Sequence, residues 1–167
     1  MKAKLIVNDR EIEVEISEEE FKTLVGPKKT GYEAAPLNDK YYYDFCGNNI
    51  LSCVESGHKS DHVLYDTANY YSDKTIAENN ARADRLIRNL RRFSVNHRET
   101  KIDWGNANQK KYFIFYHHDD QKILSDYNYI EQDAFMIYFD SDEAAIEAIE
   151  AYHDELMWYF TEYKDSL

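Results

Sequence analysis

The apolar residues near the end of the chain follow the spacing of an amphipathic helix. Between residues 140 and 163 they recur every three or four positions, which is the repeat of one buried helical face. Asp140 or Ser141 is the expected N-cap, and Asp140 with Glu143 has the spacing of a capping box. The sequence predicts that the buried face consists of Ala145, Ala148, Ile149, Tyr152, Leu156, Tyr159, Phe160 and Tyr163.

A second long helix is predicted in the middle of the chain. It begins at a cap formed by Ser72 or Asp73 and continues to about Arg98. Its apolar positions again recur at three and four residues, so they lie on one face. That face consists of Ala83, Leu86, Ile87, Leu90 and Phe93.

Alternating apolar and polar positions predict strands in the rest of the chain. Residues 3–16 have the pattern of a β-hairpin with one buried face. Ser17 with Glu20 forms a capping box that opens a short helix to about Leu24. Each long helix is also preceded by three predicted strands, at 41–45, 50–55 and 63–71 and at 112–117, 123–130 and 135–139.

The two strand-helix groups share local sequence. The motif Tyr-Tyr-Ser-Asp at 70–73 corresponds to Tyr-Phe-Asp-Ser at 138–141, with an alanine four residues after each motif, at Ala77 and Ala145. The predicted fold class is therefore α+β, with two tandem β-β-β-α units, each an antiparallel sheet covered by one long helix, after a β-hairpin and a short helix. The expected boundaries are 1–30, 31–99, a linker at 100–110 anchored by Trp104, and 111–167.

Charge is distributed unevenly along this chain of 167 residues. The net charge is −12. Residues 1–73 carry 14 acidic and 8 basic residues, residues 74–101 carry 3 and 8, and residues 102–167 carry 15 and 4. An acidic field of this kind disfavours direct binding to nucleic acid and accelerates encounter with a basic partner. The alternative is that the acidity only keeps the chain in solution.

Carboxylates form the candidate partner-binding face. Those of the last helix repeat at the helical spacing, about 5 to 6 Å apart, so they approximate the spacing of phosphates on a duplex. The alternative is a solvated helix exterior. The candidate residues are Asp126, Glu131 and Asp133 before the helix, and Asp140, Asp142, Glu143, Glu147, Glu150 and Asp154 at its start and along it.

Arginines form a second candidate surface on the first long helix. Arg82, Arg85, Arg88 and Arg92 recur at three, three and four residues, which places the four guanidinium groups on one face. Such a stripe can follow a phosphate backbone, be solvated, or pair with acids of the other unit or of a second copy of the chain. A homodimer is one expected consequence of the last alternative.

No catalytic motif was found. The sequence has no P-loop, no GxSxG and no glycine-rich dinucleotide turn, so neither catalytic residues nor a cofactor are assigned. His58, Asp61 and His62, with the pair His117-His118, leave a metal-dependent enzyme as a third alternative. A disulfide between Cys46 and Cys53 is an open possibility. The two cysteines, with no signal peptide and no apolar run near 18 residues, indicate a soluble protein of a reducing compartment.

Three segments carry a resemblance to a known group of proteins. They are GYEAAPLNDKYYYDFCGNNI, ANYYSDKTIAENNARADRLIRNLRRFSVNHRETKIDWGNANQKKYFIFY and AAIEAIEAYHDELMWYFTEYKDSL. From Gly31 onward the chain resembles small acidic accessory proteins encoded by phages and prophages of gut Firmicutes. This resemblance implies a non-enzymatic inhibitor of a host defence protein, such as an anti-CRISPR protein, that acts in the host bacterial cytoplasm on a basic effector. The alternative is a self-associating structural or replication-associated phage protein.

Overall fold

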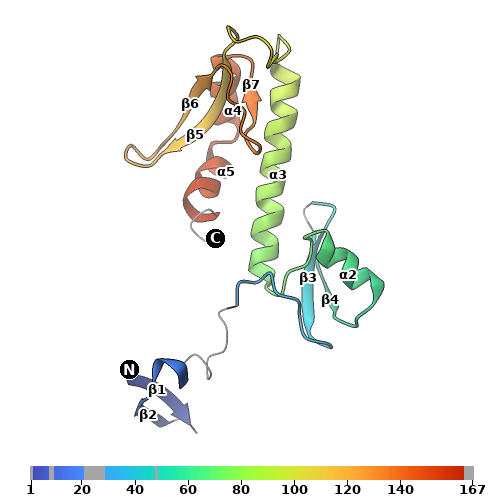
Figure 1. The fold of residues 1–167 in the computed structure, drawn as a ribbon, viewed down its shortest axis with the longest axis vertical. Helices are drawn as coiled ribbons and strands as arrows, with labels where there is room; N and C mark the ends of the chain where they lie inside the picture. The colour runs from blue at the N-terminus through green and yellow to red at the C-terminus, as the bar shows by residue number, and fades with distance from the viewer. Residues whose placement is uncertain (1, 8–9, 21–28, 48, 164–167) are drawn as a thin grey trace.

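The computed structural model describes residues 2–7, 10–20, 29–47 and 49–163. The fold is mixed α+β with antiparallel sheets, as the sequence predicts. Helix α3 (Lys74–His97) is the longest element, and the other main elements pack on its two ends (Figure 1). One lobe lies at the start of α3, and the second lies alongside the rest of the helix up to its end.

The N-terminal strands confirm the predicted hairpin. Strand β1 (Lys2–Val7) pairs with β2 (Arg10–Glu15) in an antiparallel register. Ser17 and Glu20 form the predicted capping box, since the Ser17 hydroxyl accepts from Glu20 N at 3.1 Å and the Glu20 carboxylate accepts from Ser17 N at 2.8 Å. The prediction that one face of this hairpin is buried is wrong at Ile12, which is 47% exposed, because two strands alone provide no second layer to cover an apolar face. The predicted continuation of the helix to Leu24 lies outside the described residues.

The first lobe contains the predicted hairpin but not the predicted third strand. Strands β3 (Lys40–Phe45) and β4 (Asn49–Val54) pair through a turn in which Gly47 has φ +80°. The prediction of a strand at 63–71 is wrong, because helix α2 (Lys59–Asp66) occupies much of it. His58 caps α2, and Asp61 completes a capping box. This cap stabilises a helix despite the strand-forming residues that follow it.

The second lobe has the predicted order of elements. Its sheet is β6-β5-β7, formed by β5 (Lys111–His117), β6 (Lys122–Asn128) and the short β7 (Tyr138–Phe139). The helix predicted to run through to residue 163 is divided into α4 (Asp142–Ala151), α5 (His153–Trp158) and the π-helical turn η1 (Tyr159–Tyr163). The main core of this lobe also includes Leu86 and Leu90 of α3, which therefore belongs to both lobes.

The two lobes share one local arrangement at the entrance to each helix. Tyr71 exchanges two backbone hydrogen bonds with Tyr42 of β3, and Phe139 is paired with Tyr112 of β5. Two residues later the side chain of Asp73 or Ser141 caps the helix that follows. The alanines four residues after these caps, Ala77 and Ala145, are both 0% exposed. The first lobe differs from the second in having α2 between its hairpin and the returning segment.

Candidate protein-binding surface

Helix α4 presents carboxylates outward on a rigid support. Ser141 is its N-cap, accepting a hydrogen bond from Ala144 N at 3.1 Å. Ala145 and Ala148 of the predicted apolar stripe are buried against the sheet and α3, together with Ala144. Glu143, Glu147 and Glu150 are exposed on the other side of the helix and make no ion pair with a described residue. The three carboxylates of this α4 acidic row therefore face solvent.

The acidic row is interrupted before its fourth predicted member. Tyr152 has φ −124° and ψ 22°, so the helix bends between α4 and α5. The Tyr152 ring packs edge-on against Phe93 of α3, at a centroid distance of 5.9 Å. Asp154 lies beyond this bend, exposed, with its Oδ1 atom 3.3 Å from Nδ1 of the neighbouring His153. The regular carboxylate spacing thus extends over α4 alone.

Two further candidate carboxylates form hydrogen bonds inside the protein. Oδ2 of Asp140 accepts from the backbone N–H groups of Glu99 and Thr100, at 2.8 and 2.7 Å, and holds the segment that follows α3. Asp142 accepts a hydrogen bond from Ser125 of β6. These two residues position the start of α4, and their charges add to the field beside the row.

Asp126, Glu131 and Asp133 lie on a different side of the lobe. Ser125 points toward α4, so the next residue, Asp126, points to the opposite face of the sheet. The hydroxyl of Tyr138, which shares that outer face, accepts from Asp133 N at 2.9 Å and lies 3.4 Å from the carbonyl of Glu131. All three carboxylates are exposed. Asp126 and the α4 acidic row therefore lie on opposite faces of the sheet, whereas Asp133 lines a pocket next to α3.

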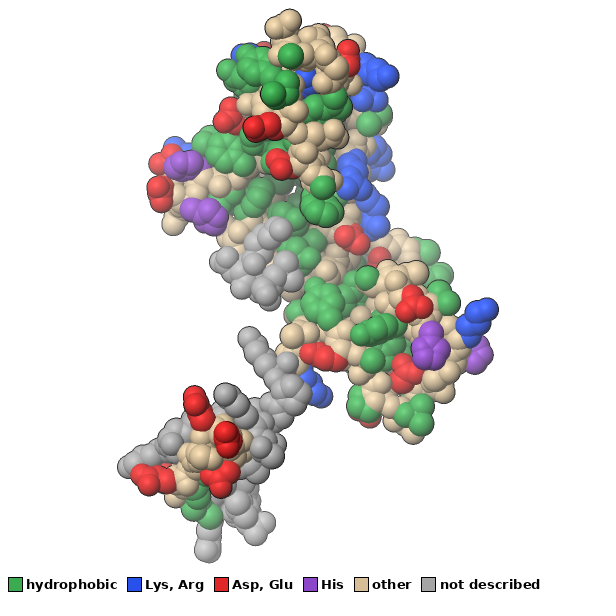
Figure 2. Space-filling view, in the orientation of Figure 1, with side chains coloured by type: hydrophobic (Ala, Val, Ile, Leu, Met, Phe, Trp, Pro, Cys, Tyr) green, Lys and Arg blue, Asp and Glu red, His purple; other side chains and the backbone are tan. Residues whose placement is uncertain are grey.

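The contacts of Arg82, Arg88 and Arg92 on α3 do not involve the α4 acidic row. Nε of Arg82 lies 2.8 Å from Oε2 of Glu155 on α5, and its guanidinium lies 3.9 Å from the centre of the Trp158 ring. Arg92 donates to Asn89, and Arg88 is exposed beside the β3–β4 turn. Basic side chains gather along one edge of the molecule beside α3 (Figure 2). The ion pair of Arg82 thus uses a glutamate outside the row.

Asp61 has a structural role at the start of α2. Both oxygens of Asp61 accept hydrogen bonds: Oδ1 from the Tyr41 hydroxyl at 2.9 Å, and Oδ2 from the backbone of Ser56 and of His58 at 3.1 and 3.0 Å. The Ser56 N–H bond holds the pKa of Asp61 below its usual range, and burial raises the pKa of Tyr41. Within the described part of the chain, no three His, Cys, Asp or Glu side chains gather as metal ligands. Cys46 and Cys53 are free and exposed.

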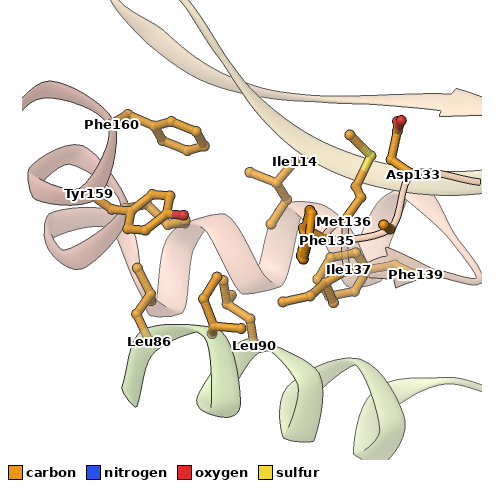
Figure 3. Close-up of a pocket in the computed structure, with 13 residues that line it drawn as sticks. Leu86, Leu90, Ile114, Asp133, Phe135, Met136, Ile137, Phe139, Tyr159 and Phe160 are labelled. Atoms are coloured by element: carbon orange, nitrogen blue, oxygen red, sulfur yellow. The ribbon is translucent and has the colours of Figure 1, made fainter. Parts of the chain in front are cut away.

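An apolar pocket of about 550 Å³ lies between α3, the sheet and η1. In Figure 3, Tyr159 and Phe160 face Phe135 and Ile137 across it, above the leucines of α3. Sequence reasoning assigned Phe135 to a strand and missed this pocket. The sequence held one sign of the pocket, the apolar run Phe135-Met136-Ile137. These three residues precede the two-residue strand β7 and line the pocket instead of extending the strand.

No protein-family model, curated protein or solved structure matches this chain. None of the helices formed by the described residues is both long and apolar enough to cross a membrane.

Proposed function

We propose that this protein is a non-enzymatic inhibitor of a nucleic-acid-handling protein, and that the α4 acidic row occupies a site that normally binds phosphates. One observation carries the proposal: Glu143, Glu147 and Glu150 are exposed and have no ion pair with a described residue. Carboxylates left unpaired on a helix keep their full attraction for a basic channel. A net charge of −12 adds long-range attraction of the same sign.

The support behind α4 favours binding over simple solvation of an exterior helix. Ala144, Ala145 and Ala148 are each 5% exposed or less, so the helix packs closely on the sheet. Close packing fixes the positions of the carboxylates before a partner arrives, which lowers the entropic cost of binding. A mobile acidic tail would have the charge without this geometry.

The class of partner follows from charge and from the resemblance to phage accessory proteins. A basic channel that holds DNA or RNA offers arginine and lysine side chains at phosphate spacing. Among host defence proteins, CRISPR effectors have such channels. The proposed setting is the cytoplasm of a bacterial host, where a phage-encoded inhibitor would meet its effector.

The test is competition for DNA. A labelled duplex bound to each member of a panel of purified CRISPR effectors is titrated with the protein, and fluorescence anisotropy reports the displaced DNA. Displacement from one effector is expected, weakening steeply as salt rises. The triple variant Glu143→Lys/Glu147→Lys/Glu150→Lys is expected to lose it.

A matched control separates the row from net charge. Asp39, Asp66 and Asp119 are exposed carboxylates away from α4, and their reversal to lysine changes the net charge equally. This control should retain most of the displacement. Equal loss in both triple variants, or no displacement by the native protein from any effector, would rule out the proposed function.

Self-association is a second candidate, favoured by the exposed Arg88, Arg91 and Arg92 beside α3. In this arrangement the arginines of one copy meet the α4 row of another. Light scattering at low and high salt tests it, since an arginine-glutamate interface dissociates as salt rises. A molar mass equal to one chain at every concentration would exclude this second function.

A further inference from the structure

Strand β5 has one fully paired side and one partly paired side. All seven of its residues are paired with β6. On its other side, β7 is paired with Tyr112 and Phe113 alone. No described strand pairs with this side at residues 114–117. Backbone groups of alternate residues therefore point toward an open edge.

The chain before β7 leaves the sheet instead of continuing along β5. A turn at Ala134 and Phe135 carries it away, and the Tyr138 hydroxyl holds the turn through Asp133 N at 2.9 Å. Phe135 is consequently 89% exposed. The predicted strand at 135–139 is thus only two residues long, and the space beside Ile114 remains unfilled by a strand.

The apolar pocket described above lies beside this open edge. Ile114 of β5 forms one part of its wall, Leu86 and Leu90 form its floor, and Phe160 lies opposite (Figure 3). Asp133 is the only charged residue among those described that line it. An open edge gives backbone hydrogen bonds, and the pocket gives a place for apolar side chains.

We propose that the open β5 edge and the pocket bind an extended segment of a partner protein, with apolar side chains at alternate positions and a basic residue next to them. A strand added to β5 directs every second side chain to one face of the sheet, where the pocket can receive it. The carboxylates of Glu131 and Asp133 are exposed and form no ion pair with a described residue. They select a basic residue in the segment.

Charge also argues against a second copy as the occupant. Pairing two β5 edges would bring together two chains of net charge −12, each with Asp133 in the pocket beside the edge. Like charges at that distance oppose association. This inference does not depend on the role of the α4 acidic row, which lies on the opposite side of the sheet from Asp126.

The test uses a panel of synthetic peptides of about six residues. Each alternates threonine with isoleucine, valine, leucine or phenylalanine and carries a flanking lysine. The panel is titrated into the full-length ¹⁵N-labelled protein, and amide shifts and amide exchange are followed. At least one peptide is expected to bind below about 1 mM, with shifts at residues 114–117 and slower exchange at alternate residues among them.

Two controls test the mode of binding. A peptide with N-methyl groups on the amides that face β5 should bind at least tenfold more weakly, because it cannot donate to the edge. The protein variant Glu131→Lys/Asp133→Lys should bind the peptide without N-methyl groups about fivefold to tenfold more weakly. The α4 triple reversal should leave peptide affinity within about twofold, so failure here is distinct from failure of the proposed function.

Three results would overturn the inference. One is that no peptide of the panel binds at about 1 mM. Another is equal affinity of the N-methylated peptide, which would mean that only apolar side chains bind. The third is a dimer in sedimentation whose formation protects the amides of residues 114–117, because a second copy would then fill the edge.

Discussion

The guanidinium of Arg82 on α3 forms an ion pair with Glu155 on α5, with Nε 2.8 Å from Oε2. The same guanidinium stacks on Trp158, 3.9 Å from the ring centre. Arg82 therefore joins the helix common to both lobes to the last helix of the chain. The contacts of Arg82 stabilise the packing of these helices, although its spacing along α3 had placed it in the candidate binding stripe of arginines.

Arg82→Ala is expected to lower the free energy of unfolding by about 1 to 2 kcal/mol, mostly through the lost stacking on Trp158. The ion pair itself contributes little, because both side chains are more than a third exposed. Urea denaturation measures the change. Arg88→Ala is the matched control on an exposed turn of the same helix, and it should shift stability by less than about 0.5 kcal/mol. An equally large loss of stability in Arg88→Ala would contradict a specific stabilising contact between Arg82 and Trp158.

Stability is expected to fall at alkaline pH because tyrosines of the first lobe resist ionisation. Burial, with a hydrogen bond to Glu55, raises the pKa of Tyr70 to about 12, and burial raises the pKa of Tyr71 to about 12 as well. Phenols of an unfolded chain ionise near pH 10. The stabilisation is therefore fully present below about pH 10 and is lost as the pH rises toward about 12.

The measurement is the urea midpoint between pH 7 and pH 11.5, in native protein and in Tyr70→Phe. The variant loses the 2.7 Å hydrogen bond to Glu55, so it is less stable at neutral pH, but its decline above pH 10 should be shallower. Parallel declines in the two proteins would show that Tyr70 is not responsible.

Ser141→Ala is expected to destabilise the protein by about 1 kcal/mol, because Ala144 N loses its cap at the start of α4. Asp140→Asn tests the neighbouring carboxylate, whose partners are Glu99 and Thr100 instead. Amide exchange separates the two changes. The serine variant should accelerate exchange in the first turn of α4, and the aspartate variant at Thr100. The reverse assignment would mean that Asp140 is the cap.

Lys111→Met is expected to lower the free energy of unfolding by about 1 to 3 kcal/mol and to release the 101–110 segment. Lys111 is 0% exposed, and its ammonium group donates to the carbonyls of Asn106 and Tyr129, at 2.8 and 2.6 Å. Thermal denaturation and amide exchange across the segment measure both effects. The adjacent Lys110, whose Nζ lies 4.0 Å from the centre of the Tyr127 ring, provides the control Lys110→Met. Lys110→Met should lower the free energy of unfolding clearly less than Lys111→Met does.

The sequence by itself determined the elements whose signals are local. The apolar spacing of α3 and α4 and the three hairpins depend on residues within a few positions of one another, so pattern alone predicts them. The exposure of Glu143, Glu147 and Glu150 followed in the same way. A helix whose one face is buried must direct the other toward solvent. For the caps the pattern left two neighbouring residues open at each helix, and the expected capping box of Asp140 with Glu143 is wrong, because Ser141 is the cap of α4.

The tertiary structure alone decided the features that depend on distant contacts. Helix α2 forms where strand propensity predicted a strand, because Leu64 packs on the Tyr41–Tyr70 cluster and Asp61 binds Tyr41. The bend at Tyr152 lets the last helices reach α3, and the exit of Phe135 from the sheet leaves the β5 edge open. The first two outcomes are set by side chains far apart in sequence, whose packing outweighs the local preference of the backbone. The exit of Phe135 is held by the hydrogen bond from Asp133 N to the Tyr138 hydroxyl.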